Sequence, residues 1–187
     1  MDSAIRVARG QVLLSAGCSG PLWRVTQGVF KLERHGQDGN TLVQLAQAGD
    51  LIGVETLCAQ PYAFTAVALV AAQAQAAGTA HTRDPLATLW QGLTQQQRQS
   101  CDMLRLRTGP IGQRLAHLLQ ILGRQADGRM LPLQRKALPT LKEMARVVDA
   151  NLETVCRELN TLLPEHAARA SKPSTAWIGH PPFALAA

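Results

Sequence analysis

The part of the sequence that most constrains the fold is Leu138–Leu163, which reads LPTLKEMARVVDANLETVCRELNTLL. Its first half predicts a helix, because Thr140 and Glu143 have the spacing of a capping box and apolar residues then recur at helical intervals. Asp149–Asn151 then breaks the pattern, since Asp and Asn tolerate a left-handed backbone better than most residues. Asn151 is also a good N-cap for a second helix. The stretch therefore predicts two short helices joined by a tight turn.

The second predicted helix has one apolar and one polar face. Its apolar residues lie at i, i+4 and i+7: Val155, Leu159 and Leu162. Glu153, Arg157 and Asn160 repeat this spacing two residues earlier, so at ~100° per residue they lie on the nearly opposite face. Arg, Asn and Glu side chains can read guanine, adenine and cytosine edges in a major groove. The pattern is typical of a helix-turn-helix, with an ordinary i,i+4 surface pair between Glu153 and Arg157 as the alternative.

The charged residues divide unevenly along the chain. Residues 1–104 hold seven Lys or Arg and seven Asp or Glu, whereas residues 105–187 hold twelve and six, so the whole net charge of +6 belongs to the part with the two helices. A basic domain is the electrostatic mark of a module that meets phosphates. A basic domain that is merely soluble is the alternative.

The second helix also carries a family resemblance. Its block Glu153–Leu159, ETVCREL, resembles the recognition helix of the Crp/Fnr superfamily of transcription regulators, and Glu143–Val148 resembles that family's first helix. The resemblance implies that Glu153 and Arg157 contact bases and that Thr154 contacts a phosphate. The full set of residues expected at double-stranded DNA is Thr140, Asn151, Glu153, Thr154, Arg157, Asn160, Arg169 and Lys172.

Residues 10–80 read as short apolar-rich runs separated by turn residues, which is typical of a small barrel or jelly roll. The block Gly49–Gly53, GDLIG, resembles the corresponding turn of the Crp/Fnr sensor β-roll. The resemblance therefore implies an α+β fold with an N-terminal jelly-roll or β-roll sensor domain, a long dimerisation helix and a C-terminal winged helix-turn-helix.

Three residues are candidates for effector binding. In Crp/Fnr members that bind a cyclic nucleotide, a Glu after the turn holds the ribose, and an Arg followed by Ser or Thr holds the phosphate. The resemblance places Glu55 close to the first position and Phe64–Thr65 at the second, so Phe64 replaces the arginine. A buried phosphate without a cationic partner is costly. We therefore expect neither cyclic AMP nor cyclic GMP, and we assign Glu55, Phe64 and Thr65 to an unknown effector.

The sequence gives little support for a metal or a cofactor. The cysteines are widely spaced and form no C-x-x-C pair: Cys18, Cys58, Cys101 and Cys156. This spacing indicates neither a zinc site nor a disulfide framework. We expect no metal and no cofactor, with haem left open because His35, His81 and Cys58 are present, although a lone His is more often a surface residue than a ligand.

Residues 85–107 predict one long helix, with Pro85 in its first turn and Thr108–Pro110 as a break. A roughly heptad path with a polar middle runs along it: Leu86, Leu89 or Trp90, Leu93, Gln97, Ser100 or Cys101, and Leu104. The resemblance implies that this helix pairs with its two-fold mate, and packing on its own β-roll is the alternative. Another amphipathic helix is expected over Ile111–Leu122, with a hinge at Gly109–Pro110 before it.

The C-terminal third departs from the superfamily pattern. Met130–Leu133 is expected to form a wing-type strand. Residues 164–187 are rich in Ala and Pro, and only Thr175–Ile178 has a strand-like pattern where the superfamily has a hairpin wing.

These observations predict a transcription regulator rather than an enzyme. We expect a β-roll sensor domain over residues 1–80, a dimerisation helix over 81–108 and a winged helix-turn-helix DNA-binding domain over 109–187. A homodimer would bind a palindromic operator, respond to a small-molecule effector and act on RNA polymerase. No apolar run approaches ~18 residues and the start lacks a signal-peptide layout, so we expect a cytoplasmic protein without a membrane span. The alternatives are a cupin-like β-barrel metalloenzyme, which needs clustered His and Glu ligands, and a ligand-binding protein with a non-functional DNA module.

Overall fold

The computed structural model describes residues 4–37, 39–77 and 84–164. Its N-terminal part is a roll of two four-stranded antiparallel sheets, with strand orders β1-β8-β3-β6 and β2-β7-β4-β5. The strands are β1 Ile5–Val7, β2 Val12–Leu14, β3 Trp23–Gln27, β4 Val29–Gly36, β5 Gly39–Gln47, β6 Leu51–Ile52, β7 Thr65–Ala68 and β8 Ala72–Ala76. The prediction of a β-rich region over residues 10–80 is confirmed for the described residues of that range.

The β4–β5 hairpin is the longest pairing of the roll and extends from its body. Val29 lies opposite Gln47 at the base and Gly36 opposite Gly39 at the tip, with a register shift next to Leu32. Alternate side chains of the roll point inward and form its core, because successive residues of a strand face opposite sides. The buried residues of that core include Val25, Phe30, Ala46, Ala66 and Ala74.

Gly28 forms the tight connection between β3 and β4. Its φ is 77°, in the left-handed region that favours glycine. A Cβ at this position would also lie 2.6 Å from the carbonyl oxygen of Ala71. Backbone conformation and close approach therefore both require glycine where the chain passes from one sheet to the other.

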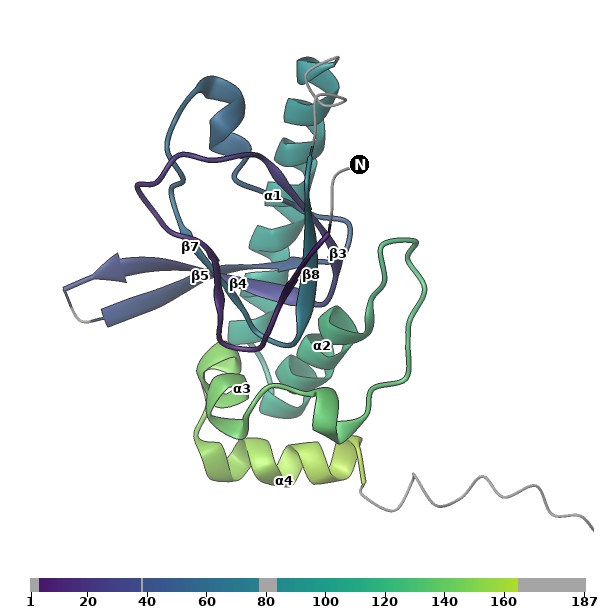
Figure 1. Ribbon diagram of the computed structural model, residues 1–187. Coiled ribbons are helices and arrows are strands. Elements are labelled where there is room, and N and C mark those ends of the chain that lie inside the picture. The colour runs from purple at the N-terminus through teal and green to yellow at the C-terminus, as the bar shows by residue number, and fades with distance from the viewer. Residues whose placement is uncertain (1–3, 38, 78–83, 165–187) are drawn as a thin grey trace, which may run out of the picture.

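The described helices pack on one side and at one end of the roll (Figure 1). The helices are α1 Pro85–Arg107, α2 Ile111–Gly123, α3 Leu141–Val148 and α4 Leu152–Leu162, with short 3₁₀ turns η1 Val54–Cys58 and η2 Arg135–Ala137. The long helix α1 runs along the roll, and α2, α3 and α4 cluster beyond its C-terminal end. The expected helices over residues 85–107 and Ile111–Leu122 are both confirmed, and Gly109 breaks the chain between them with φ 84°.

A second apolar core joins the roll to the helices. The roll contributes Val29, Leu42, Leu45, Leu69 and Val70. The helices contribute Leu106, Leu115, Leu118, Ile121, Leu122, Met144, Ala145, Val147, Val148, Val155 and Leu159. The α2–α4 cluster is thus packed against the roll and against the end of α1, rather than connected only through its hinge.

The expected strand over Met130–Leu133 is wrong for the part of the chain that the structure describes. Met130 forms only an isolated bridge with Arg124, and the Leu131 amide donates to the Gly123 carbonyl at 2.9 Å. Pro132 has no amide to continue a ladder. The segment therefore follows the end of α2 as extended chain.

Candidate nucleic-acid interface and ligand pocket

The two helices expected from Leu138–Leu163 are present as α3 and α4. Thr140 caps α3, and its Oγ1 accepts a hydrogen bond from the Glu143 amide at 3.2 Å. The reciprocal half of the expected capping box is replaced by a long-range contact, because Glu143 Oε2 lies 3.0 Å from Lys31 Nζ on β4. Glu143 thus ties α3 to the roll.

The turn between α3 and α4 has the predicted backbone. Asp149 ends α3 in the left-handed region, with φ 51°. Asn151 then caps α4, and its Oδ1 accepts from the Thr154 amide at 2.8 Å. The left-handed residue and the cap together fix the angle between the helices, since the cap satisfies a backbone group that the helix leaves free.

The outer face of α4 presents Glu153 and Arg157 to solvent. The opposite face is anchored by Val155 and Leu159, which are 0% and 4% exposed. Thr154 lies between the faces and is half-buried. Figure 1 shows α4 on the outer side of the helical cluster, away from the roll. The predicted arrangement of a buried back and an exposed polar front is present.

The C-terminal end of α4 differs from the expectation. Asn160 is exposed, but its Oδ1 already accepts a hydrogen bond from Arg135 Nη2 at 2.7 Å. Arg135 also donates to the Leu163 carbonyl, so it caps the end of the helix. Leu162, expected on the buried face, is 39% exposed, because α4 ends there and none of the described residues up to 164 adds a further turn over it.

The remaining candidate DNA contacts cannot be placed in the same way. Thr140 and Asn151 are exposed but serve as helix caps. Arg169 and Lys172, and the strand-like Thr175–Ile178, lie outside the described residues. The described part of the interface therefore centres on Glu153, Thr154 and Arg157.

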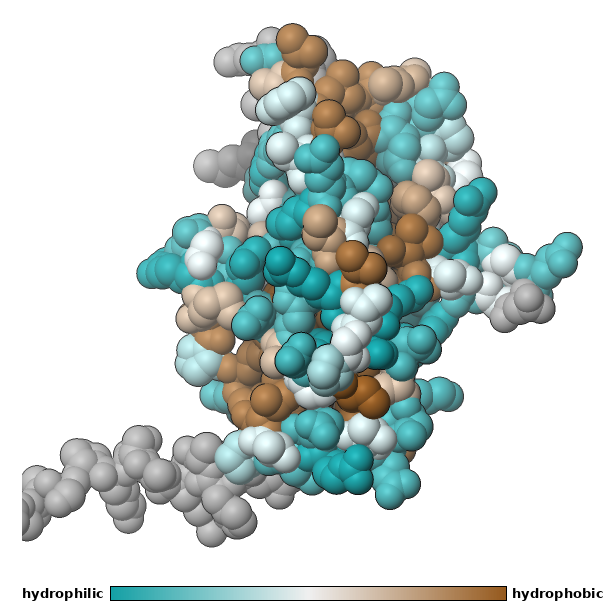
Figure 2. Space-filling model, turned by 180° about the vertical axis from the view of Figure 1, so that it is seen from behind, coloured by the Kyte–Doolittle hydropathy of each residue, from teal (hydrophilic) through white to brown (hydrophobic). Residues whose placement is uncertain are grey.

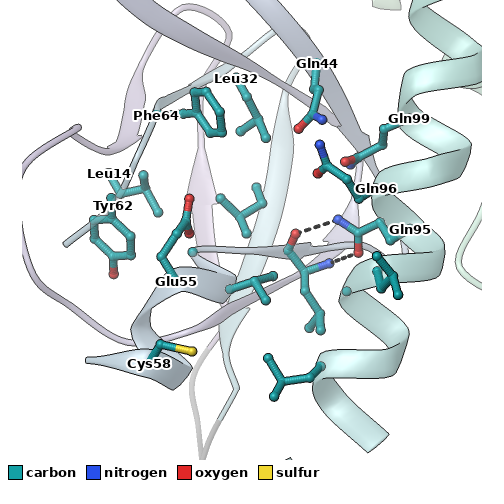
Figure 3. Close-up of a pocket in the computed structure, with 17 residues that line it drawn as sticks. Leu14, Leu32, Gln44, Glu55, Cys58, Tyr62, Phe64, Gln95, Gln96 and Gln99 are labelled. Atoms are coloured by element: carbon teal, nitrogen blue, oxygen red, sulfur yellow. Dashed lines mark hydrogen bonds between the residues drawn. The ribbon is translucent and has the colours of Figure 1, made fainter. Parts of the chain in front are cut away.

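A cavity of about 370 Å³ lies between the inside of the roll and α1 (Figure 3). Its apolar walls come from β2, β4, β6 and η1, from the residue before β7 and from the N-terminal half of α1: Leu14, Leu32, Leu51, Ile52, Val54, Phe64, Leu89 and Leu93. Its polar lining consists of Gln44, Glu55, Cys58, Tyr62, Gln95, Gln96 and Gln99. No Lys, Arg or His is among the described residues that line it.

Two of the three candidate effector residues line this cavity. Glu55 and Phe64 both face it, whereas Thr65 Oγ1 accepts a hydrogen bond from the Ala16 amide at 3.1 Å outside it. The glutamines were missed by sequence reasoning. Their signal was present, because Gln95, Gln96 and Gln99 recur at helical spacing on one side of α1, but nothing local indicates that this side meets a cavity.

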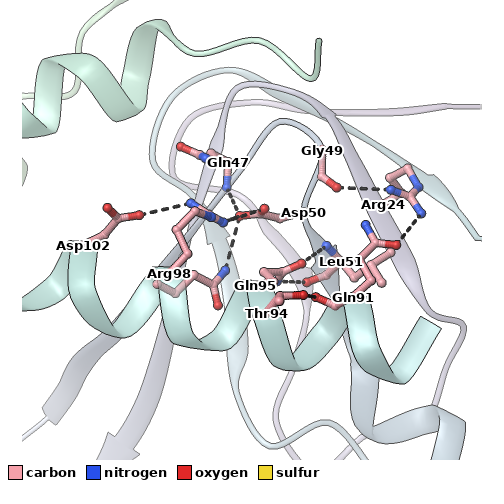
Figure 4. A network of polar contacts seen from close by, with 11 residues as sticks. Arg24, Gln47, Gly49, Asp50, Leu51, Gln91, Thr94, Gln95, Arg98 and Asp102 are labelled. Carbon is pink, nitrogen blue, oxygen red and sulfur yellow. Dashed lines mark hydrogen bonds and ion pairs between the residues drawn. The ribbon is translucent and has the colours of Figure 1, made fainter. Parts of the chain in front are cut away.

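The roll is attached to α1 by a polar network, which we call the α1 seam (Figure 4). It comprises Arg24, Asp50, Leu51, Gln91, Gln95, Arg98, Gln99 and Asp102. Both oxygens of the Asp50 carboxylate accept hydrogen bonds from Arg98 Nη2 at 2.7 Å. The Gln95 amide bonds the Leu51 backbone in both directions, at 2.7 and 2.8 Å. Burial raises the pKa of the Asp50 carboxyl, against the opposing effects of Arg98, the Gln47 amide and Gln99.

A smaller group of charges attaches the roll to α3, and we call it the α3 seam. It comprises Lys31, Glu33, Glu143 and Arg146. Lys31 Nζ lies 3.0 Å from Glu33 Oε1 and 3.0 Å from Glu143 Oε2, and Arg146 Nη1 lies 3.3 Å from Glu33 Oε1. The contacts to Glu33 are charge contacts, because its Oε1 has no well-aligned hydrogen bond among the described residues.

The remaining expectations concern a metal site, haem ligands and a membrane span. Among the described residues, no group of three or more His, Cys, Asp or Glu side chains could hold a metal ion. His35 lies on the β4–β5 hairpin, where its ring contacts Asn40 at 2.8 Å, while Cys58 lines the cavity and His81 lies outside the described residues. In residues 4–37, 39–77 and 84–164, no helix is long and apolar enough to cross a membrane.

Comparison with known proteins gives one match to the N-terminal roll and structural matches over most of the chain. Residues 4–81 match the family model of the cyclic nucleotide-binding domain. A CRP-family transcriptional regulator from Thermus thermophilus has a similar structure, with a TM-score of 0.60 and 23% identity, over 84% of this chain and 83% of that one. The fold is therefore that of the Crp/Fnr regulators, as the sequence resemblance implied, and residues 4–81 resemble the cyclic nucleotide-binding domain.

Two further solved structures support the Crp/Fnr fold. A CRP/FNR-family regulator from the same organism gives a TM-score of 0.57 at 24% identity, over 86% of this chain and 85% of that chain. FixK2 from Bradyrhizobium japonicum gives 0.57 at 19% identity, over 87% and 84%. No curated protein sequence matches the chain. At these identities the Crp/Fnr likeness establishes the arrangement of roll, long helix and helical cluster.

Proposed function

We propose that this protein is a sequence-specific DNA-binding transcription regulator that acts as a homodimer. The observation that carries the proposal is the outer face of α4, where Glu153 and Arg157 stand exposed over a buried Val155–Leu159 back. Two short helices joined by a tight turn, with the exposed polar face on the second, support a helix-turn-helix whose second helix would enter the major groove. In that position Arg157 would bond guanine, Glu153 would accept from cytosine, and Thr154 would contact a phosphate.

Charge and packing support the same reading of this end of the molecule. The basic excess of the sequence lies entirely in residues 105–187. Neutralising phosphates with Lys and Arg releases counterions and supplies much of the affinity for DNA. The exposed face of α4 is also held in place. Side-chain caps fix the starts of α3 and α4, and the opposite face of α4 belongs to the core shared with the roll.

The homodimer is supported by an apolar face on α1. In the N-terminal half of α1 its large exposed side chains are Leu86, Leu89, Trp90 and Leu93, and Trp90 is 68% exposed. Figure 2 shows hydrophobic residues gathered over the upper part of the molecule, where α1 begins. A contiguous apolar patch marks an interaction surface, and a two-fold axis along α1 would place two α4 helices on one face of the DNA, ~34 Å apart.

The DNA-binding role is tested by selecting bound sequences from a random pool with the purified protein. We expect a symmetric consensus with half-sites one helical turn apart. Arg157→Ala should weaken binding to that consensus by ~5- to 150-fold, about 1–3 kcal/mol. Arg34→Ala is the matched control, because Arg34 is an exposed arginine on the β4–β5 hairpin and far from α4. Equal affinity of wild type and Arg157→Ala would refute the assignment of α4.

The dimer is tested separately by sedimentation. Leu93→Glu places a charge in the apolar face of α1 and should shift the protein to a monomer. Met130→Glu is the control, because Met130 is 52% exposed, like Leu93, but lies outside α1. A monomeric wild type, or a dimer that survives Leu93→Glu, would contradict the two-fold arrangement.

We also propose that an effector binds in the cavity between the roll and α1, and that it is not a cyclic nucleotide. Phe64 stands on this lining where cyclic nucleotide-binding relatives place a phosphate-binding arginine, and no cation replaces it among the described lining residues. The test is titration with cyclic AMP and cyclic GMP, with Tm as readout. A rise in Tm with either nucleotide at micromolar concentration would contradict this part of the proposal.

A further inference from the structure

We propose that the cavity accepts an uncharged, mainly apolar small molecule that carries one amide or hydroxyl group, which hydrogen-bonds the glutamine side chains at one end of the cavity. This inference deepens the effector site and rests on that part of the proposed function. The binding itself does not depend on whether the protein reads DNA.

The residue that carries this inference is Gln44. Its side chain comes from β5 and is 5% exposed, yet it has no hydrogen-bond partner among the described residues. Figure 3 shows the Gln44 amide directed at Gln96 and Gln99, which reach in from α1. The amide is accessible from the cavity, because neither of its polar atoms is among the described atoms that are fully buried without a hydrogen bond. A ligand carbonyl, amide or hydroxyl at this point would satisfy it.

The neighbouring glutamines differ in how far they are already used. Gln95 bonds the Leu51 backbone with its amide, so it is part of the wall. Gln99 is 2% exposed and donates to Asp50 Oδ2 at 3.3 Å, which leaves its carbonyl oxygen directed at the cavity end. Gln96 is exposed at the rim, and its side chain has no partner among the described residues. Hydrogen-bond donors and acceptors are therefore both present at this end of the cavity.

The remaining walls select an apolar body. Leu14, Leu32 and Phe64 come from the roll, and Leu89 and Leu93 come from α1. The volume of about 370 Å³ falls within the range of small-molecule sites, ~300–1,000 Å³. An apolar group that displaces water from these walls is favoured by the hydrophobic effect.

The charge of the lining disfavours anions. Glu55 is the only Asp, Glu, Lys, Arg or His among the described lining residues. Its Oε1 accepts from the Ala63 amide at 3.3 Å and faces the same apolar space. A phosphate or carboxylate would lose its hydration, gain no cation and meet this carboxylate. A neutral ligand avoids these penalties.

A ligand bound at this site would form a bridge between the roll and α1. A group that bonds both Gln44 and Gln96 connects β5 to the helix that carries the proposed dimer face. Ligand occupancy would therefore favour one position of α1 relative to the roll, since a ligand shifts an equilibrium only through contacts that differ between its states.

The probes for the test are benzamide and benzoate, which share shape and size but differ in charge, together with cyclic AMP. Each is titrated into ¹⁵N-labelled full-length protein, and the glutamine side-chain amide signals are followed by NMR. We expect benzamide to shift the signals of Gln44, Gln96 and Gln99 at millimolar concentration. Benzoate should bind at least about tenfold more weakly, and cyclic AMP should leave these signals unchanged.

Three variants assign the effect to the cavity. Gln44→Leu keeps the side-chain size and removes both hydrogen-bonding groups, so benzamide affinity should fall by about tenfold. Gln96→Leu changes an exposed helical residue, which keeps the test open if the buried variant does not fold. Gln73→Leu is the matched control, because Gln73 lies on β8 and does not line the cavity.

Several outcomes would overturn the proposal. These are benzoate or cyclic AMP binding as well as benzamide, signal changes outside the cavity, unchanged affinity in both Gln44→Leu and Gln96→Leu, or no binding of benzamide up to its solubility. Selection of DNA by the ligand-free protein is measured independently. A failure there refutes the regulator while leaving the cavity result standing.

Discussion

The roll meets its helices through two seams of different construction. The α1 seam is a mixed network in which amide side chains and a carboxylate–guanidinium pair hold backbone groups of the roll. The α3 seam is made of four charged side chains, and its outer members are more exposed, with 31% for the Glu143 side chain and 42% for Arg146. Exposed ion pairs are screened by water and salt, whereas buried directional hydrogen bonds are not.

The difference indicates where the molecule can rearrange. Moving α1 away from the roll would leave the Leu51 backbone without the Gln95 side chain and the Asp50 carboxylate with only the Gln47 amide. Moving α3 would break charge contacts that water can replace, together with the apolar contacts of the shared core. We therefore expect the helical cluster to separate from the roll more readily than α1 does, with Gly109 as the pivot.

The largest expected effect comes from removing the centre of the α1 seam. Asp50→Ala leaves the Gln47 amide and part of Arg98 unpaired. We expect the free energy of unfolding to fall by about 2–3 kcal/mol, below the range for a fully buried pair because Arg98 is partly exposed and keeps Asp102. Urea denaturation measures the change. Asp127→Ala, at an exposed ion pair with Arg129, should leave the midpoint unchanged.

A smaller loss is expected at the buried end of the α3 seam. Lys31→Met removes the cation next to Glu33, whose side chain is 4% exposed and then has only Arg146 as a charged neighbour in the seam. We expect the free energy of unfolding to fall by about 1–2 kcal/mol, because the lysine stem is replaced by a side chain of similar size. A loss larger than that of Asp50→Ala, measured in the same urea titration, would reverse the ranking of the two seams.

A still smaller effect is expected at the exposed end of the α3 seam. Glu143→Gln breaks the pair with Lys31 and should reduce the free energy of unfolding by no more than about 1 kcal/mol. The difference should shrink in ~1 M salt, where the Debye length is ~3 Å. Hydrogen exchange should become faster in α3 and stay unchanged in α1. Faster exchange in α1 would show that the seams are not independent.

The smallest effect concerns pH. Burial raises the pKa of Asp50 in the folded protein, so the folded state binds a proton that the unfolded state has already released. The contribution of Asp50 to the free energy of unfolding therefore decreases as pH rises from the ordinary Asp range to the folded pKa, and is constant above it. Unfolding of wild type and Asp50→Asn between about pH 4 and 7 measures this contribution. A constant difference between the two proteins across this window would contradict a raised pKa.

The sequence predicted the elements that depend on near neighbours. The bounds of α1 and the caps Thr140 and Asn151 follow from proline, Asx and Thr signals within a few residues. The exposed pair Glu153 and Arg157 follows from a helical period. Local signals failed where a helix ends or a distant partner intervenes. Leu162 follows the apolar period of the helix but is not buried. The Glu143 side chain pairs with Lys31 on β4 instead of completing the capping box.

Only the tertiary structure decided the cavity. Its lining runs from Leu14 to Gln99, and the packing of α1 against β5 and η1 determines which side chains share it. Nothing within a few residues of Gln44 distinguishes a glutamine aimed into a cavity from one on a surface. The reading face of α4 could be predicted because a helix sets its own faces through contacts at i+3 and i+4. The cavity could not, because it is a space between elements and its shape depends on contacts between residues far apart in the chain.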